Sequence, residues 1–458
     1  MTYHEGGKLS AASMEFLSVS LCFVLFLFII QSVTSQKPTI KENAIYPPRG
    51  WNSYAAYGWI INEDDFMKNA GELSSRLLDH GYEVATVGPF WHRNVDDGSD
   101  SVDEWGRPFP DPKRWPSSVN GVGFKDVAQR VHRLGLKFGI HKKPYFELHT
   151  WRAGEIYTVP CSYEFNFLHV NTSLGAGKAY MHSLIQLFVD WGVDYVKLDC
   201  VFGESFDLGT ITTVSEIMKT LDEPMILSVS PGDKATVEMS KQINGLVNMY
   251  RVGPNSLDQW PLVRDHYFDL ARDYAAARLI GVDGLRGNSW PDLDMLPFGR
   301  LTDPEKKEGP QRLSQLTIDE QKTQMTLWSM AKSPIMFGGD LVRLPLETFI
   351  LLIHPVLTEI SFYSSNNMEF VNKPDTNLRA WVATGRNPGR VYVALFNPHD
   401  LARSTSVSLP YIGTIVQGHP FRDCKGRDIW NDDSTVANGF ASTQLRIHGC
   451  SLFVLDCN

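Results

Sequence analysis

The chain has 458 residues, about three times the roughly 150 that one domain typically takes, so more than one domain is expected. Hydrophobic residues make up 43% of the chain and charged residues 21%, a composition that supports a large core and excludes an intrinsically disordered protein. The 43 Lys and Arg against 52 Asp and Glu give a net charge of −9 without any basic run, which argues against a nucleic-acid partner.

The first expected element is a secretory signal over residues 1–35. An apolar run from about Phe16 to Ile30 is shorter than the ~20 residues that a membrane span needs, and the small residues after it suit cleavage after Ser35. The alternative is an uncleaved signal anchor. With cleavage no stable membrane span remains, so we expect a secreted protein, extracellular in the cell wall or vacuolar. The sequon at Asn171 fits a glycoprotein of this pathway.

Three segments then share one pattern, in which an amphipathic helix ends at a glycine and a short apolar run follows. The glycines are Gly81, Gly135 and Gly192, and each supplies the left-handed residue at which many helices end. Helix followed by strand at a spacing of about 55 residues indicates alternating elements and hence a parallel sheet.

Eight strands are expected in all. Their ranges are 51–54, 84–87, 137–140, 195–198, 225–230, 246–251, 289–296 and 335–338. Eight strand–helix units over roughly 310 residues fit an α/β fold of the (β/α)8 TIM barrel type, which we place at 46–360. The alternative is an open doubly wound sheet, although no glycine-rich phosphate-binding motif follows the first strand.

After about residue 360 the sequence pattern changes from alternating helices and strands to short β-prone runs. Two β-prone runs, 378–384 and 390–396, flank the turn residues 385–389, which is a hairpin signature. Further short β-prone runs continue to the end of the chain. We therefore expect a small antiparallel β-sandwich domain over 365–458.

Polar side chains at the carboxyl ends of barrel strands carry the chemistry of such folds. The fourth expected strand places Lys197 and Asp199 on one side, where the ammonium would keep the carboxylate ionised, as a glycosidic nucleophile requires. A structural ion pair is the alternative. The sixth strand ends at Arg251, and the seventh carries Asp292 and Asp294. No histidine or EF-hand spacing accompanies these two acids, so no metal is expected.

Five motifs follow one another along the chain. They are GWNS at 50–53, GLKFGI at 135–140, WGVDYVKLDC at 191–200, WPDLDML at 290–296 and KSPIM at 332–336. Together they resemble the α-galactosidase (melibiase) family of glycoside hydrolases, most of all its plant branch with β-L-arabinopyranosidase-like members. The resemblance spans about residues 46–458. It implies a catalytic barrel, a C-terminal β domain, retaining hydrolysis at a terminal sugar, no cofactor, and an oligosaccharide or cell-wall glycan as partner.

The resemblance also assigns roles to single residues. Asp199 matches the family nucleophile, Lys197 the substrate-binding lysine, and Asp294 the acid that binds a sugar hydroxyl. Arg251 matches the arginine that precedes the acid/base by four positions, and Trp51 is expected at the barrel mouth. Both are expected to bind substrate together with Lys197 and Asp294.

Five cysteines remain after signal cleavage, an odd number that permits at most two disulfides. Cys161 and Cys200 resemble a pair that braces the nucleophile strand, although the family cysteine more often lies two residues past the nucleophile. The pairing among Cys424, Cys450 and Cys457 stays open.

Two departures from the family pattern concern catalysis. The acid/base aspartate expected four residues after Arg251 is Asn255, which can hydrogen-bond but cannot deliver a proton. The second strand ends in VGPFW at 87–91, without the one or two aspartates that would hold sugar hydroxyls. Asp258 is the alternative proton donor.

The sequence thus predicts an α-galactosidase-like retaining glycoside hydrolase that cleaves terminal α-D-galactosyl or β-L-arabinopyranosyl residues. Asp199 is its nucleophile and Asn255 occupies the acid/base position. Loss of general acid/base catalysis typically costs about 10²–10⁴-fold in rate. The alternative is therefore a catalytically impaired family member that acts by binding glycans. Sugar preference and oligomeric state are left open.

Overall fold

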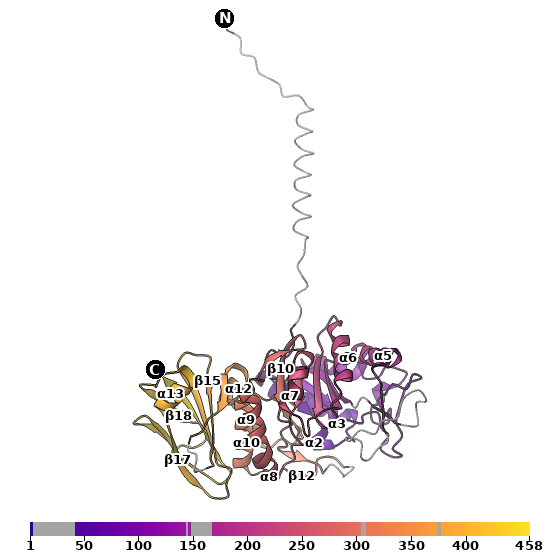
Figure 1. Ribbon diagram of the computed structural model, residues 1–458. Coiled ribbons are helices and arrows are strands. Elements are labelled where there is room, and N and C mark those ends of the chain that lie inside the picture. The colour runs from indigo at the N-terminus through magenta and orange to yellow at the C-terminus, as the bar shows by residue number, and fades with distance from the viewer. Residues whose placement is uncertain (3–41, 143–144, 148–166, 304–307, 373–376) are drawn as a thin grey trace. The chain divides into compact units, whose positions relative to one another are not determined.

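The computed structural model describes residues 1–2, 42–142, 145–147, 167–303, 308–372 and 377–458 (Figure 1). The chain divides into two compact units, Met1–Lys41 and Glu42–Asn458, and the second holds every helix and strand of the described residues. The expected signal over residues 1–35 lies outside the described residues except for its first two positions.

A closed ring of parallel strands forms the first part of the second unit. In the described residues its order is β13-β1-β2-β3-β6-β7-β8-β10, with every neighbouring pair parallel, and a bridge between Leu296 and Phe337 joins the segment after β10 to β13. The bounds are β1 Arg49–Asn52, β2 Val84–Val87, β3 Lys137–Lys142, β6 Tyr195–Phe202, β7 Ile226–Pro231, β8 Met249–Arg251, β10 Gly287–Asp292 and β13 Ile335–Phe337. The predicted TIM barrel is confirmed, and the open sheet is excluded.

Helices alternate with these strands and surround the ring. They are α2 Tyr54–Tyr57, α3 Glu63–Leu77, α4 Lys125–Arg133, α5 Gly175–Trp191, α6 Leu208–Lys219, α7 Val237–Ile243, α8 Trp260–Leu262, α9 Phe268–Ala276, α10 Ile318–Met330, α11 Leu346–Leu352 and α12 Pro355–Tyr363. The predicted glycines have the left-handed conformation, with φ of 78° at Gly135 and 81° at Gly192. Short strands lie in the connections: β4 Tyr145–Glu147, β5 Phe167–His169, β9 Val282–Gly284, β11 Arg300–Leu301 and β12 Arg312–Leu313.

One apolar stretch of the described residues, Leu346–Tyr363, is long enough to cross a membrane by length and composition. In the fold it is the two helices α11 and α12, which Ile353 and His354 separate. Its buried side chains, among them Leu352, Leu357 and Ile360, belong to the main core.

The barrel interior is packed below its mouth. Side chains from successive strands meet there in a separate buried cluster, consisting of Val84, Tyr195, Ile226, Met249, Met295 and Met336. Because side chains alternate along a strand, Tyr195 on β6 puts Lys197 and Asp199 on the same inward side, one and two layers further along. The apolar layer therefore forms the floor under the polar strand ends.

The C-terminal part is an antiparallel β-sandwich, as predicted. One sheet has the order β14-β15-β16-β21-β18 and the other β17-β20-β19. The bounds are β14 Ser365–Glu369, β15 Arg379–Thr384, β16 Arg390–Phe396, β17 Arg403–Ser408, β18 Cys424–Asp428, β19 Thr435–Ala437, β20 Phe440–Leu445 and β21 Cys450–Cys457, with α13 Leu409–Gln417 beside them. The predicted hairpin is the antiparallel pair β15 and β16.

The larger sheet of the sandwich is buried on both faces. Trp381 and Ala383 of β15 join the core of the barrel, whereas Ala380 and Val382 join the core between the two sheets. This division follows from the alternation of side chains along a strand. Helices α9 and α10 cover the barrel-side face (Figure 1), so one apolar surface unites barrel and sandwich.

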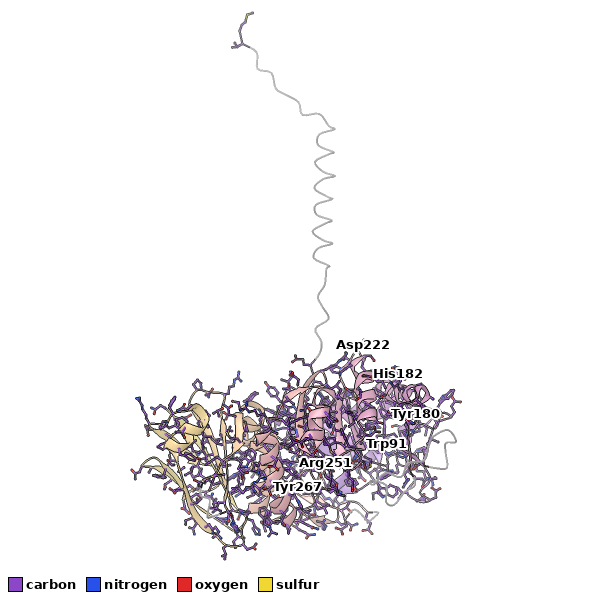
Figure 2. The ribbon with its side chains drawn as sticks, in the orientation of Figure 1. Trp91, Tyr180, His182, Asp222, Arg251 and Tyr267 are labelled. Atoms are coloured by element: carbon purple, nitrogen blue, oxygen red, sulfur yellow. A yellow bond between two sulfur atoms is a disulfide. The ribbon has the colours of Figure 1, made fainter. Side chains whose placement is uncertain are left out.

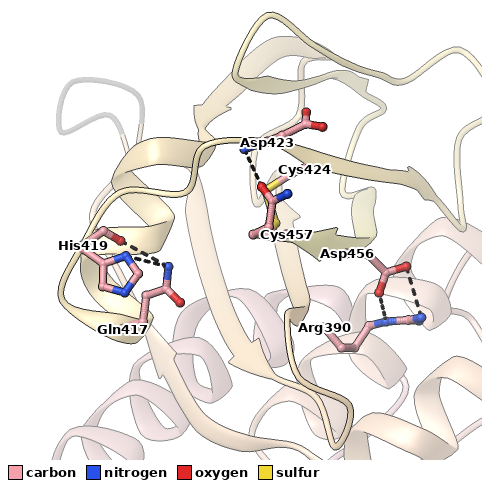
Figure 3. Close-up of a disulfide and its surroundings, with 8 residues drawn as sticks. Arg390, Gln417, His419, Asp423, Cys424, Asp456 and Cys457 are labelled. Atoms are coloured by element: carbon pink, nitrogen blue, oxygen red, sulfur yellow. Dashed lines mark hydrogen bonds and ion pairs between the residues drawn. A yellow bond between two sulfur atoms is a disulfide. The ribbon is translucent and has the colours of Figure 1, made fainter.

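The structure resolves the open cysteine pairing. Cys424 and Cys457 form a disulfide between the neighbouring strands β18 and β21 (Figure 3), and Cys450 is a free, buried thiol whose pKa burial raises to about 12. Cys200 is disulfide-bonded as well. Cys161 lies outside the described residues, so its pairing with Cys200 stays a prediction, as does glycosylation at Asn171.

Replacing both Cys424 and Cys457 with serine is expected to lower the free energy of unfolding by about 3–4 kcal/mol, because the bridge spans a sequence separation of 33 residues and its loss frees the unfolded chain. Urea denaturation followed by circular dichroism measures the change. Each single serine variant should be as unstable as the double variant. A double variant with the wild-type midpoint would contradict the role given to the bridge.

Candidate active site

A cavity of about 380 Å³ lies at the carboxyl ends of the barrel strands. It is lined by the five predicted strand-end residues Lys197, Asp199, Arg251, Asn255 and Asp294. These residues come from β6, from β8 and the loop after it, and from the segment after β10. The position agrees with the rule that barrel chemistry collects at this face.

Trp51 does not lie at the barrel mouth as expected. Its indole is fully buried, donates a hydrogen bond to the carbonyl of Gly339 (2.8 Å) and packs against Phe66 of α3. Tyr54, three residues further along, lines the cavity instead. Trp51 lies within β1 and faces the helical layer, whereas Tyr54 lies beyond the strand end, where the chain turns into α2.

The carboxylate of Asp199 is fixed between two neighbouring strands. Its Oδ1 accepts a hydrogen bond from Ser230 Oγ at the end of β7 (2.8 Å), and its Oδ2 lies 3.4 Å from Nε2 of His141 at the end of β3. The side chain is 14% exposed. Asp199 thus faces the cavity as a positioned carboxylate that a ligand can reach.

An irregularity in β6 accompanies this placement. The register between β6 and β7 shifts between Leu198 and Phe202, and Cys200 has a φ of 62°, which side-chain-bearing residues seldom adopt. Bulges of this kind redirect side chains and occur next to active sites. The disulfide-bonded Cys200 therefore marks the point where the regular strand is interrupted, directly after Asp199.

Asp294 is the most deeply buried carboxylate of the site. Its Oδ1 lies 3.8 Å from Lys197 Nζ, and its Oδ2 lies 3.5 Å from Arg251 Nη1 and accepts from the backbone N–H of Ser256 (2.8 Å). Burial alone would raise the pKa of Asp294, but Arg251 and Lys197 outweigh it and the pKa is lowered. Asp294 is therefore an anion, and Lys197 is its ion-pair partner.

Asn255 is held by the arginine that precedes it. Its Oδ1 accepts a hydrogen bond from Arg251 Nη2 (2.9 Å), and Arg251 Nε donates to the carbonyl of Gly253 (3.1 Å). Arg251 is labelled in Figure 2. The amide at position 255 thus has a defined place in the cavity wall but offers no acidic proton.

Asp258, the alternative proton donor, is already engaged. Arg312 grips its carboxylate with both terminal nitrogens (2.5 and 3.0 Å), and the backbone N–H of Gln315 donates to it as well (2.8 Å). The bidentate guanidinium contact occupies both carboxylate oxygens. Asp258 lines the cavity as part of this ion pair, which argues against proton donation.

The end of β2 contributes an apolar wall. Pro89 and Phe90 line the cavity, next to Gly88, whose N–H donates to Ser53 Oγ (2.8 Å). A Cβ at position 88 would lie 3.1 Å from that oxygen and 3.2 Å from the carbonyl oxygen of Gly58. The local packing therefore leaves little room for an acid at this position.

Sequence reasoning missed Tyr54, His141 and Ser230. The last two stand at strand ends, as do the residues that were found, so a systematic search for polar residues at these positions would have included them. Among the described residues, no three His, Cys, Asp or Glu side chains are grouped so as to hold a metal ion.

Comparison with known proteins agrees with this geometry. The sequence profile described as "Alpha galactosidase A" matches residues 168–360, and that of the "Alpha galactosidase C-terminal beta sandwich domain" matches residues 375–455. The chain belongs to the α-galactosidase family of glycoside hydrolases, GH27. An α-galactosidase from Oryza sativa subsp. japonica is 24% identical over 414 residues, which cover 90% of this chain and 85% of the rice protein.

Solved structures share the fold of this chain. A GH27 β-L-arabinopyranosidase from Geobacillus stearothermophilus has a TM-score of 0.79 and 28% identity, covering 90% of this chain and 97% of that one. α-Galactosidase I from Mortierella vinacea, with a TM-score of 0.67 and 18% identity over 92% of this chain and 98% of its own, shares the fold.

The charge of Asp292 is expected to make stability depend on pH. Burial is the main reason that its pKa rises from 3.8 to about 6; Lys197 opposes the rise and Asp294 adds to it. The folded state holds this proton more tightly than the unfolded state, so the stabilisation is complete below pH ~4 and is lost as the pH rises through about 6.

The variant Asp292→Asn retains an oxygen acceptor for the N–H of Asp294, which Asp292 Oδ1 accepts at 2.8 Å. From pH 4 to pH 7, the unfolding free energy of the wild type should therefore fall by about 2–2.5 kcal/mol relative to the variant. Urea titrations of both proteins at each pH measure the difference. A gap that stays constant with pH would refute the assignment.

Proposed function

We propose that this protein is an α-galactosidase-like retaining glycosidase that acts on terminal α-D-galactosyl or β-L-arabinopyranosyl residues, with Asp199 as nucleophile and Asn255 at the acid/base position. The observation that carries the proposal is the fixed, accessible carboxylate of Asp199 in a cavity that also contains the buried Lys197–Asp294 pair. The Geobacillus relative, solved in complex with arabinose, supports a sugar of this class.

The first step follows from the positions of these groups. Lys197 and Asp294 offer a donor and an acceptor to the sugar hydroxyls. Asp199 attacks the anomeric carbon, a covalent glycosyl–enzyme bond forms, and the bond to the leaving oxygen breaks. In an ordinary retaining enzyme a second carboxyl group protonates that oxygen. Asn255 has no such proton, so the leaving group departs as an anion.

The second step needs water to attack the glycosyl–enzyme and to lose a proton. An amide at position 255 does not accept that proton, so water attacks without a general base. Both steps are therefore slow. The first step is slowed least when the leaving group is stable as an anion. The expected enzyme is therefore slow, and faster on activated aryl glycosides than on natural glycans.

The second candidate function is glycan binding without significant turnover. It is favoured by the state of the carboxylates among the described cavity-lining residues: Asp199 is the attacking group, Asp258 is paired with Arg312, and Asp294 is an anion. None of the three is placed as a proton donor. We further propose the secretory route for either function, with the cell wall, the extracellular space or the vacuole as destination, on the basis of the N-terminal sequence.

A panel of aryl α-D-galactoside, β-L-arabinopyranoside and α-N-acetylgalactosaminide on the mature protein tests the proposal. Slow release from at least one of the first two is expected, and Asp199→Asn should abolish it, because the amide is not a nucleophile. The readout is the absorbance of the released phenolate. Release that persists in the Asp199→Asn variant would exclude Asp199. No release from any substrate, with glycan binding intact, would favour the binding protein.

Restoring the carboxyl group at position 255 tests the acid/base argument separately. Asn255→Asp is expected to raise kcat/KM on unactivated oligosaccharides by about 10²–10⁴-fold, with a smaller gain on aryl substrates. Asn255→Ser is the matched control, since it changes the side chain without adding an acid. Sugar release measured by chromatography gives the rates. Equal rates for the aspartate and serine variants, both folded, would contradict the assignment of position 255.

A further inference from the structure

A second hollow, of about 500 Å³, lies outside the candidate active site, between the turn at Asp103–Arg107 and helix α5. Its most conspicuous wall is Trp105, whose side chain is 64% exposed. Among the tryptophans that the structure describes, it is the one that belongs to the exposed class. Tryptophan is usually largely buried, so an indole held in solvent suggests a ligand.

The turn that carries Trp105 is firmly built. Asp103 Oδ1 accepts from the backbone N–H groups of Trp105 (3.0 Å) and Arg107 (2.9 Å), and its Oδ2 accepts from Arg107 Nε (2.7 Å). Backbone hydrogen bonds between Asp103 and Arg107 (2.9 Å) and between Gly106 and Asp103 (3.0 Å) close the turn. The backbone under the indole is therefore organised before any ligand arrives, which reduces the entropic cost of binding.

The same turn is anchored to α5. Arg107 Nη1 donates to the carbonyl of Ser183 (3.1 Å), and the hydroxyl of Tyr180 donates to the carbonyl of Gly106 (3.4 Å). Tyr180, labelled in Figure 2, also lines the hollow. An exposed indole, a tyrosine and the polar groups of Asp103, Glu104 and Arg107 thus surround one space.

We propose that this hollow is a secondary binding site for a glycan chain, with the face of Trp105 as the stacking surface for a pyranose ring. The C–H bonds on one face of a sugar ring present weakly positive, apolar surface to the negative face of an indole. The surrounding carboxylate, guanidinium and hydroxyl groups suit ring hydroxyls. A protein partner would call instead for a contiguous apolar patch, which a single indole among charged neighbours does not provide.

The topology connects this site to the candidate active site. The segment between β2 and α4 supplies Pro89 and Phe90 to the catalytic cavity and Trp105 to the hollow. The proposal rests on the carbohydrate ligand class of the proposed function but not on hydrolysis. A polymer held at Trp105 would be retained on the protein whether or not its terminal residue is cleaved.

Affinity electrophoresis of the full mature protein in gels that contain galactomannan or arabinogalactan tests the site. The wild type should be retarded by at least one polymer, and Trp105→Ala should weaken its apparent affinity by about tenfold or more, whereas Trp105→Phe should retain part of it. Tyr411→Ala is the matched control, because Tyr411 is an exposed aromatic residue (45%) on α13 of the sandwich.

Turnover of an aryl glycoside, or binding of a monosaccharide if there is no turnover, should be unchanged in Trp105→Ala. This readout separates the hollow from the cavity. If the wild type shows no aryl turnover, the proposed catalysis is overturned but the secondary site is not. Absence of retardation of the wild type in both polymers overturns the secondary site. Equal retardation of Trp105→Ala and the wild type would also overturn it, as would a Tyr411→Ala variant that loses as much affinity as Trp105→Ala. Both comparisons use variants that have the wild-type melting temperature.

Discussion

The buried carboxylate of Asp294 is the interaction on which the geometry of the cavity depends. It lies after β10 and contacts Lys197 from β6, Arg251 from β8 and the N–H of Ser256 from the following loop. Removing one partner from such a buried network leaves an uncompensated charge, at a cost of about 3–5 kcal/mol. Arg251 in turn holds Asn255. The ligand-binding framework is thus maintained by stability requirements that are independent of turnover.

This independence explains how the site can combine family features with departures from them. Position 255 contributes an amide that Arg251 still orders, and β2 ends in Pro89 and Phe90, next to a glycine that has little room for a side chain. The two departures lie in the segments after different strands, β2 and β8, but line the same cavity. Under the proposed function they change the position of the proton donor and one wall of the sugar site, while the Asp199 carboxylate and the Asp294 network are present.

Much of the fold could be predicted because its signals are local. The glycine-terminated helices and the apolar runs gave the barrel strands to within a few residues, and the turn at 385–389 gave the β15–β16 hairpin. Strand ends and alternation were enough to place Lys197 and Asp199 on one inward face. The resemblance to a family singled out Asn255, which periodicity alone would not have distinguished from an ordinary loop residue.

The remaining features depend on distances that a linear pattern does not contain. Trp51 was expected at the mouth because it belongs to a family motif, but its indole faces the helices and Tyr54 lines the cavity. Lys197 pairs with Asp294, almost a hundred residues away, whereas the sequence pattern suggests Asp199 on the same strand as its partner. The disulfide between Cys424 and Cys457 and the ion pair between Asp258 and Arg312 also join residues that are distant in the sequence, so only the packed structure identifies them.

The larger sheet of the sandwich, β14-β15-β16-β21-β18, is buried on both faces, and this limits how the protein can be divided or recombined. A barrel cut after Tyr363 would leave bare the apolar surface against which Trp381, Tyr392 and Phe396 pack, and a detached sandwich would carry those rings into water. Either fragment would tend to aggregate, since a contiguous exposed apolar surface promotes self-association. Barrel and sandwich should therefore be expressed and engineered as one piece, and recombination between relatives should keep their interface residues together.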